Sequence, residues 1–162
     1  MRERVREAPQ GEAAEYAVYP PDLWEPHRTE RYVLGEQMYA LLGIPREDKA
    51  ARRRWFERNY EFFGAPSALF CYVDRRMGAP QWSDLGMYLQ TVMLLLREAG
   101  LDSCPQECWA LYRETVDALI APPSEWMLFC GLAIGYADPQ APVNRLESHR
   151  LPLQAFAEFR GF

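Results

Sequence analysis

The longest regular pattern of apolar and polar positions lies between Ser83 and Ala99. On a helical wheel its apolar residues form one stripe, which consists of Leu85, Leu89, Val92, Leu96 and Ala99 and is widened by Tyr88 and Leu95. A second, smaller apolar patch, Met87 and Leu94, lies among the polar positions. Ser83 is a typical N-cap residue, and Gly100 suits a left-handed helix end. The pattern predicts a central core helix and leaves open whether it also contacts a partner chain.

Two other runs, 68–73 and 126–136, are apolar at nearly every position and are typical of buried strands. Between them and around the central helix, glycines and prolines delimit further predicted helices at 1–8, 29–42, 45–63 and 107–121. Three parts are expected to be irregular. A proline-rich segment at 9–27 drapes over the fold, a tight loop at 104–107 follows the central helix, and an extended C-terminal arm at 139–162 contains at most one short helix.

These elements predict a single α+β domain over residues 1–162. An apolar fraction of 49% is ordinary for a globular protein. A net charge of −5 lacks the basic footprint of a nucleic-acid-binding protein. The chain holds no apolar run of the ~18–20 residues that a membrane span needs, and its charged start is unlike a signal peptide. We therefore expect a cytoplasmic protein with reduced thiols, without nucleic-acid or membrane partners.

The sequence contains no side-chain pattern for nucleophilic catalysis, so we predict no catalytic side chain. His27 and His149 are isolated from any nucleophile. Cys104 and Cys108 are four residues apart but lack a second pair of metal ligands, so no metal site is predicted. If the protein is an enzyme, its chemistry should belong to a cofactor that the chain positions.

Three segments, in this order and spacing, resemble the nitroreductase family of FMN-dependent oxidoreductases. The first begins at Asp84, reads D-L-G-x-x-L-Q and continues to G-L-D-S-C-P-Q-E. The second begins at Met127 and reads M-L-F-C-G-L-A-I-G-Y-A-D. The third is a tail that begins at Asn144 and contains R-L-P-L. The resemblance implies a nitroreductase-like fold with an antiparallel-type central sheet and surrounding helices. It also implies a homodimer through the helix at 83–99, with FMN as cofactor and NAD(P)H as electron donor.

In that family, the loop after the central helix lies against the flavin. The resemblance therefore assigns Pro105, Gln106 and Glu107 as FMN contacts, with backbone N–H groups that follow a proline of fixed φ. It assigns Arg150, just before Leu-Pro-Leu, to the FMN phosphate, because a guanidinium can bind phosphate in a bidentate manner. Many members carry a basic residue at the position of Ser148, and this chain does not.

The chain also departs from the family at its start. Members begin with a basic helix of the type R-R-S-x-R, a loop with Ser, Asn and Gln, and a strand, whereas this sequence is expected to start inside the next helix, near 2–8. It is thus interpreted as incomplete at the N-terminus. Two functions follow: an FMN-dependent oxidoreductase that reduces nitroaromatics or quinones in a ping-pong cycle, or a non-catalytic remnant that dimerises without flavin. The substrate and the choice between NADH and NADPH are not readable from the sequence.

Overall fold

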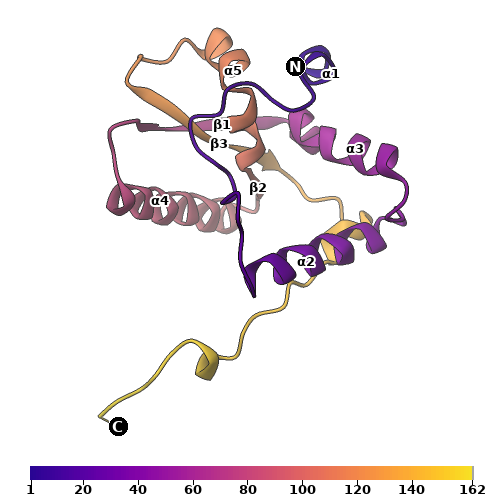
Figure 1. Ribbon diagram of the computed structural model, residues 1–162, viewed down its shortest axis with the longest axis vertical. Coiled ribbons are helices and arrows are strands. Elements are labelled where there is room, and N and C mark those ends of the chain that lie inside the picture. Colours follow the sequence, from indigo (N-terminus) through magenta and orange to yellow (C-terminus); the bar gives the residue numbers. More distant parts are fainter. Residues whose placement is uncertain (162) are drawn as a thin grey trace.

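A three-stranded antiparallel sheet forms the centre of the computed structural model, which describes residues 1–161. The strands are β1 (Ser67–Asp74), β2 (Asp102–Gln106) and β3 (Trp126–Gly135), and β3 lies between the other two (Figure 1). β1 and β3 confirm the two predicted strands. The two outer edges of the sheet belong to β1 and β2 within the described chain.

Strand β2 corrects the prediction of a loop after the central helix. Its sequence, D-S-C-P-Q, has no apolar alternation and includes a proline, so the local pattern gives no strand signal. It is extended because it pairs with β3, from Asp102 opposite Gly135 to Gln106 opposite Gly131. The pairing comes from the tertiary structure, which local propensity does not report.

The central helix, α4 (Ala79–Glu98), begins four residues earlier than predicted. Its N-cap is Gly78, whose N–H donates to the Gln81 side chain at 3.3 Å, so Ser83 lies inside the helix rather than capping it. The end is as expected, because Gly100 has φ +77°. Leu89 is buried and packs on Cys71 and Cys130, which are paired in register across β1 and β3.

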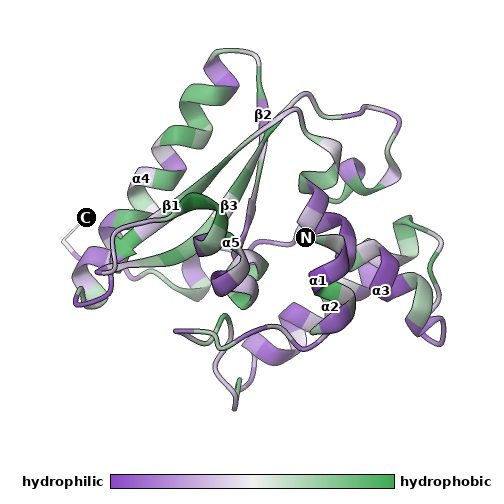
Figure 2. Cartoon of the chain, turned by 90° about the horizontal axis from the view of Figure 1, so that it is seen from above, coloured by the Kyte–Doolittle hydropathy of each residue, from purple (hydrophilic) through white to green (hydrophobic). Residues whose placement is uncertain are grey.

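The side of α4 turned away from the sheet is apolar and exposed. Met87 and Leu94 are each 60% exposed, and Tyr88 and Leu95 are each 57% exposed. Figure 2 shows that α4 and β3 carry most of the hydrophobic colour, whereas α1 (Arg2–Glu7) and α3 (Lys49–Glu57) are largely hydrophilic. The helix therefore has the predicted second apolar patch, enlarged by two residues that had been expected to widen the core stripe.

The other face of the sheet carries an aromatic core. Its buried members come from α1, η1 (Arg58–Gly64), η2 (Glu107–Tyr112), α5 (Arg113–Ile120) and β3, and they are Val5, Tyr60, Trp109, Tyr112, Val116 and Leu128. The predicted helix 107–121 is thus divided at Tyr112, and the apolar residues Leu119 and Ile120 near its end are 79% and 46% exposed. The predicted helix 45–63 is divided as well: α3 ends at Glu57, η1 follows from Arg58, and Phe62 and Phe63 leave the helical conformation with positive φ.

The chain between α1 and β1 makes an excursion that contains α2 (His27–Leu41) and α3. α2 has no buried residue. Arg52 of α3 joins the two helices by a bidentate pair with Glu36 at 2.6 and 2.9 Å, and its guanidinium lies over the Tyr39 ring. Asp48 caps α3, so Pro45 precedes the helix instead of starting it.

The C-terminal arm is extended, as predicted, with the short turns η3 (Pro142–Arg145) and η4 (Leu153–Ala155). It passes α2 at η3 and then leaves the body of the molecule (Figure 1). In residues 1–161, no helix combines the length and apolar character needed to cross a membrane.

Candidate functional site

The turn at 105–107, made of the last two residues of β2 and the first of η2, presents two of its residues outward and one inward. Pro105 and Glu107 are exposed, whereas Gln106 is only 2% exposed. The Gln106 amide donates to the Asn59 backbone oxygen at 2.9 Å and to Asn59 Oδ1 at 3.1 Å. Its oxygen accepts from Trp109 Nε1 at 3.4 Å. Gln106 is therefore used inside the fold, and Glu107 is the exposed residue of the turn that can offer a backbone N–H to a ligand.

Arg150, the second predicted site residue, lies in the tail and not beside this turn. Its guanidinium donates to Ser148 Oγ at 2.5 Å and to the carbonyls of Ser148 and His149. The tail has by then left the body of the molecule (Figure 1). A single chain therefore does not bring the two parts of the predicted site together.

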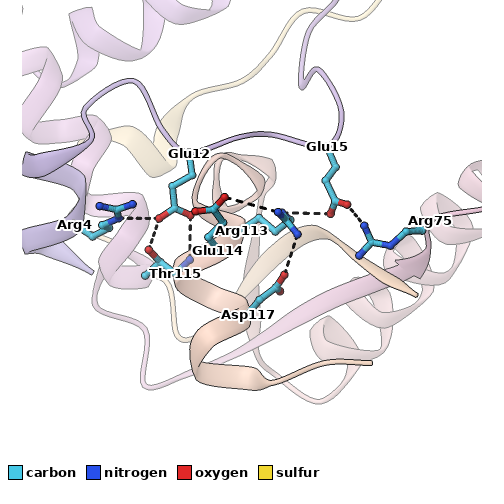
Figure 3. Close-up of polar contacts among 8 residues, drawn as sticks. All are labelled: Arg4, Glu12, Glu15, Arg75, Arg113, Glu114, Thr115 and Asp117. Atoms are coloured by element: carbon cyan, nitrogen blue, oxygen red, sulfur yellow. Dashed lines mark hydrogen bonds and ion pairs between the residues drawn. The ribbon is translucent and has the colours of Figure 1, made fainter. Parts of the chain in front are cut away.

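The start of the proline-rich segment is held against α5 by two glutamates (Figure 3). Glu12 accepts from the backbone N–H and the hydroxyl of Thr115, at 3.0 and 2.5 Å, and from Arg4 Nε at 2.9 Å. Burial disfavours the charged form, but the hydrogen bonds from Thr115 and Arg4 outweigh it, so the pKa of Glu12 lies below its ordinary value.

Glu15 forms the second attachment. Its carboxylate pairs with Arg75 and, at 3.6 Å, with Arg113 of α5, which also lies 3.6 Å from Asp117 (Figure 3). Neither attachment can be recognised from the sequence, because both depend on partners about 60 to 100 residues away. The expectation that the segment drapes over the fold is confirmed for its first part.

Tyr16 continues this attachment on the side of α4. Its hydroxyl donates to the Phe129 carbonyl, its ring stacks on Phe129 at 5.8 Å, and the Trp82 ring meets it edge-on at 5.3 Å. Burial raises the pKa of Tyr16, so the hydroxyl remains a donor at any physiological pH. The segment therefore joins helix α5, strand β3 and helix α4.

A cavity of about 380 Å³ opens where η1 and the residues after β3 approach the start of β2. Its lining is aromatic and polar and includes Trp55, Arg58, Phe63, Ser103, Tyr136 and Asn144. The lining reaches Cys104 but includes neither the exposed turn at 105–107 nor Arg150. This cavity is thus separate from the predicted site residues.

The remaining reactive groups do not form a catalytic arrangement. Cys71 and Cys130 are buried free thiols, as expected. Burial, followed by the nearby Glu107 carboxylate, raises the pKa of Cys108 to about 12, so this thiol stays protonated at neutral pH. His27 packs edge-on against Trp24 on the surface. The turn after β2, a fixed backbone with two outward residues, remains the best candidate for ligand contact.

Comparisons with known proteins agree with this architecture. The family model described as "Nitroreductase family" matches residues 7–136. The nitrobenzene nitroreductase of Ectopseudomonas oleovorans is 34% identical over 157 residues, which cover 97% of this chain and 69% of that protein. The 4-nitrobenzoate reductase of Pseudomonas putida is 36% identical, with coverage of 90% and 64%.

Two solved structures share the fold in detail. The FMN and NADPH-dependent nitroreductase NfnB from sphigopyxis sp. strain HMH is 51% identical, with a TM-score of 0.88 over 93% of this chain and 67% of that one. NfnB from Mycobacterium smegmatis, solved with NADPH, is 26% identical with a TM-score of 0.89 and coverage of 99% and 74%. This chain spans about two thirds of the length of such relatives. With the sheet, the central helix and the turn in place, the chain belongs to the nitroreductase family.

Proposed function

We propose that this protein is an FMN-dependent oxidoreductase that uses NAD(P)H to reduce nitroaromatic compounds or quinones. The observation that carries the proposal is the turn at 105–107, which stands exposed on a buried, hydrogen-bonded base at the end of the edge strand β2. Relatives named for nitrobenzene and 4-nitrobenzoate reduction support the substrate class.

The residues of the turn fit one edge of a flavin ring. β2 has no strand partner on its outer side within residues 1–161, so backbone groups on that side are open to a ligand. Pro105 fixes its own φ and offers no N–H, and Gln106 is buried, which leaves the amide of the exposed Glu107 as the donor that follows. A ring nitrogen that gains electron density is stabilised by such fixed N–H groups.

The chemistry that FMN would supply when bound is hydride transfer through its N5, from NAD(P)H to the nitroaromatic or quinone, in a ping-pong cycle. The chain's part is to hold and orient the ring through the Glu107 amide and to bind the phosphate through Arg150. Because the tail leaves the body of a single chain, we assign Arg150 to the site only in the assembled homodimer. The exposed apolar side of α4 is the surface on which we place the second copy.

The alternative function, a dimerising protein without flavin, is favoured by one observation: Arg150 and the turn are apart in the single chain. An absorbance spectrum of purified protein after incubation with FMN and gel filtration separates the two. If the protein is the oxidoreductase, we expect the gel-filtered protein to retain a flavin absorbance band at about 450 nm and to oxidise NAD(P)H when 4-nitrobenzoate is added. A folded dimer that elutes without the band supports the alternative.

Arg150 can be tested with a matched variant in the same tail. Arg150→Ala should weaken FMN binding roughly tenfold or more, because it removes a charge-assisted bond to phosphate. Arg160→Ala removes another exposed arginine, which pairs with Glu158, and it should leave FMN binding unchanged. Equal FMN affinities in both variants would show that Arg150 does not hold the phosphate.

A further inference from the structure

The turn at 105–108 rests on η1, a segment that lies almost fifty residues upstream. Gln106 is a polar residue in the buried core, and its amide group is bonded to the backbone and to the side chain of Asn59. Asn59 is itself fixed, because its Nδ2 donates to the Phe56 carbonyl at 2.8 Å. A buried amide with bonds on both its nitrogen and its oxygen allows the backbone that carries it little rotation.

The other end of the turn is attached to the next residue of η1. The Tyr60 hydroxyl donates to the Cys108 carbonyl at 3.4 Å. Tyr60 is 5% exposed, and burial raises its pKa, so the hydroxyl keeps its proton. Asn59 and Tyr60 thus hold the residues on either side of Glu107, while Glu107 itself faces solvent.

The backbone just after this attachment is strained. Phe62 and Phe63 have φ of 51° and 53°, a region that is unfavourable for a residue with a side chain. The conformation places the Phe62 ring on Trp109, with centroids 4.5 Å apart and planes at 23°. Packing against the turn therefore offsets the strain.

Strand β3 leaves space for the indole ring of Trp109 at Gly131. A Cβ on Gly131 would lie 2.5 Å from Trp109 Cδ1, so only glycine leaves room for the ring there. Gly131 is also the register partner of Gln106. The turn, η1 and β3 therefore meet at one tightly packed point below Glu107.

We propose that Asn59 is a positioning residue for the flavin-facing turn: through the buried Gln106 amide, and together with Tyr60 at Cys108, it fixes the direction of the Glu107 backbone N–H. The proposal rests on the proposed function, because it names what positions the amide that would meet the flavin. It assigns a role to a residue that does not itself touch the ligand.

Three variants test the attachment. Asn59→Ala removes the side-chain acceptor at 3.1 Å but keeps the backbone acceptor, and Asn59→Asp keeps an acceptor at that position. Both lose the bond to Phe56, so the pair isolates the contact with Gln106. Gln106→Leu removes the whole contact at similar volume. Asn144→Ala, which deletes an exposed asparagine bonded to Asp138, is the control for the loss of an asparagine side chain.

The readouts are FMN affinity from fluorescence quenching, the visible circular dichroism of bound FMN, and amide hydrogen exchange of residues 105–109. We expect FMN binding about tenfold weaker in Gln106→Leu, a smaller loss in Asn59→Ala, and recovery in Asn59→Asp. The change in dichroism and the acceleration of exchange should likewise be largest in Gln106→Leu, smaller in Asn59→Ala and smallest in Asn59→Asp. Asn144→Ala should match the unmodified protein in all three readouts.

Two outcomes are decisive. If Gln106→Leu and Asn59→Ala lower the melting temperature but leave FMN affinity, dichroism and exchange at 105–109 unchanged, Asn59 has only a structural role and the proposal is wrong. If the unmodified protein binds no FMN, the proposed function fails separately. Exchange then still shows whether Asn59 fixes the turn, and unchanged exchange rejects that as well.

Discussion

At the scale of single residues, Glu12 is the clearest case of a side chain whose role only the structure reveals. Its carboxylate is 2% exposed and accepts the N–H and hydroxyl of Thr115 in the first turn of α5. That turn has N–H groups without helical partners, and a carboxylate there is favoured by the helix dipole. In the sequence, Glu12 is one acidic residue among several in an irregular segment, so nothing distinguishes it.

Glu12→Gln should destabilise the protein by about 1–3 kcal/mol at pH 7, because it weakens bonds to a buried charge. The folded state lowers the pKa of Glu12 from an ordinary value near 4.5, so its contribution is complete above that value and is lost as the pH falls through the folded pKa. Urea unfolding at pH 7 and below pH 4.5 should show the difference between the two proteins shrinking in acid.

The matched control for this prediction is Glu7→Gln. Glu7 lies 3.6 Å from the same Arg4, but its side chain is 60% exposed. An exposed pair contributes at most about 1 kcal/mol, so this variant should unfold almost like the unmodified protein. If both variants lose the same stability, burial of Glu12 is not the cause.

The four cysteines differ in environment, and alkylation should follow that difference. Cys104 is exposed, whereas Cys71 and Cys130 are 7% and 1% exposed and Cys108 has a pKa raised to about 12. Iodoacetamide on the native protein should therefore label Cys104 first. Its own pKa is also raised, by partial burial and by the Glu107 carboxylate, so the labelling rate should still increase between pH 7 and 9. Peptide mass spectrometry identifies the site; early labelling of Cys130 would contradict the packing of α4 on the sheet.

At the scale of elements, the sequence predicted the helices and strands that hydrophobic periodicity reveals, and it missed those features that depend on contacts between distant segments. β1, β3 and the body of α4 carry apolar patterns that can be recognised from the local sequence alone. β2 is extended because it pairs with β3, and α4 begins at Ala79 because the Gln81 side chain caps the N–H of Gly78 just before it. The candidate site follows the same division: its turn was located by resemblance, but its support by Asn59 and Tyr60 joins segments distant in the chain.

Helices α2 and α3 depend on one arginine for their mutual position. Arg52 binds both oxygens of Glu36, the Pro45 carbonyl and the Tyr39 ring, while α2 has no buried residue to hold it. Arg52→Ala should therefore free α2 without unfolding the sheet. We expect chymotrypsin to cut between residues 38 and 46 several-fold faster, with little change in the global urea midpoint.

Arg53→Ala is the control on the same helix. Arg53 is 52% exposed and pairs only one helical turn away, with Glu57 at 2.9 Å. Its loss should leave the digestion rate unchanged, because it does not connect the two helices. Equally fast digestion of both variants would mean that charge on α3, rather than the contact with Glu36, protects α2.

At the scale of the whole molecule, a large part of the exposed apolar surface is concentrated in patches of the kind found at protein–protein interfaces. Exposed hydrophobic side chains gather on the outer side of α4, on α2 and along the tail, and they include Tyr32, Val33, Met87, Leu94, Leu95, Leu151 and Phe156. Single exposed apolar residues are normal, but a continuous side of a 20-residue helix is not. The sequence indicated this through Met87 and Leu94, yet it could not separate Tyr88 and Leu95 from the core stripe.

Leu94→Arg tests whether a second copy covers α4. A charge buried without a partner in an interface is strongly unfavourable, so the dissociation constant of the dimer should rise about a hundredfold or more. Leu119→Arg places the same charge on α5, at a leucine that is 79% exposed, and it should leave the dimer intact. Sedimentation velocity over a dilution series measures both. Because Arg150 is assigned to the site only in the assembled homodimer, Leu94→Arg should also lose FMN, while Leu119→Arg retains it. A monomeric unmodified protein would refute the homodimer, and a dimeric Leu94→Arg that still holds FMN would place the interface on another surface.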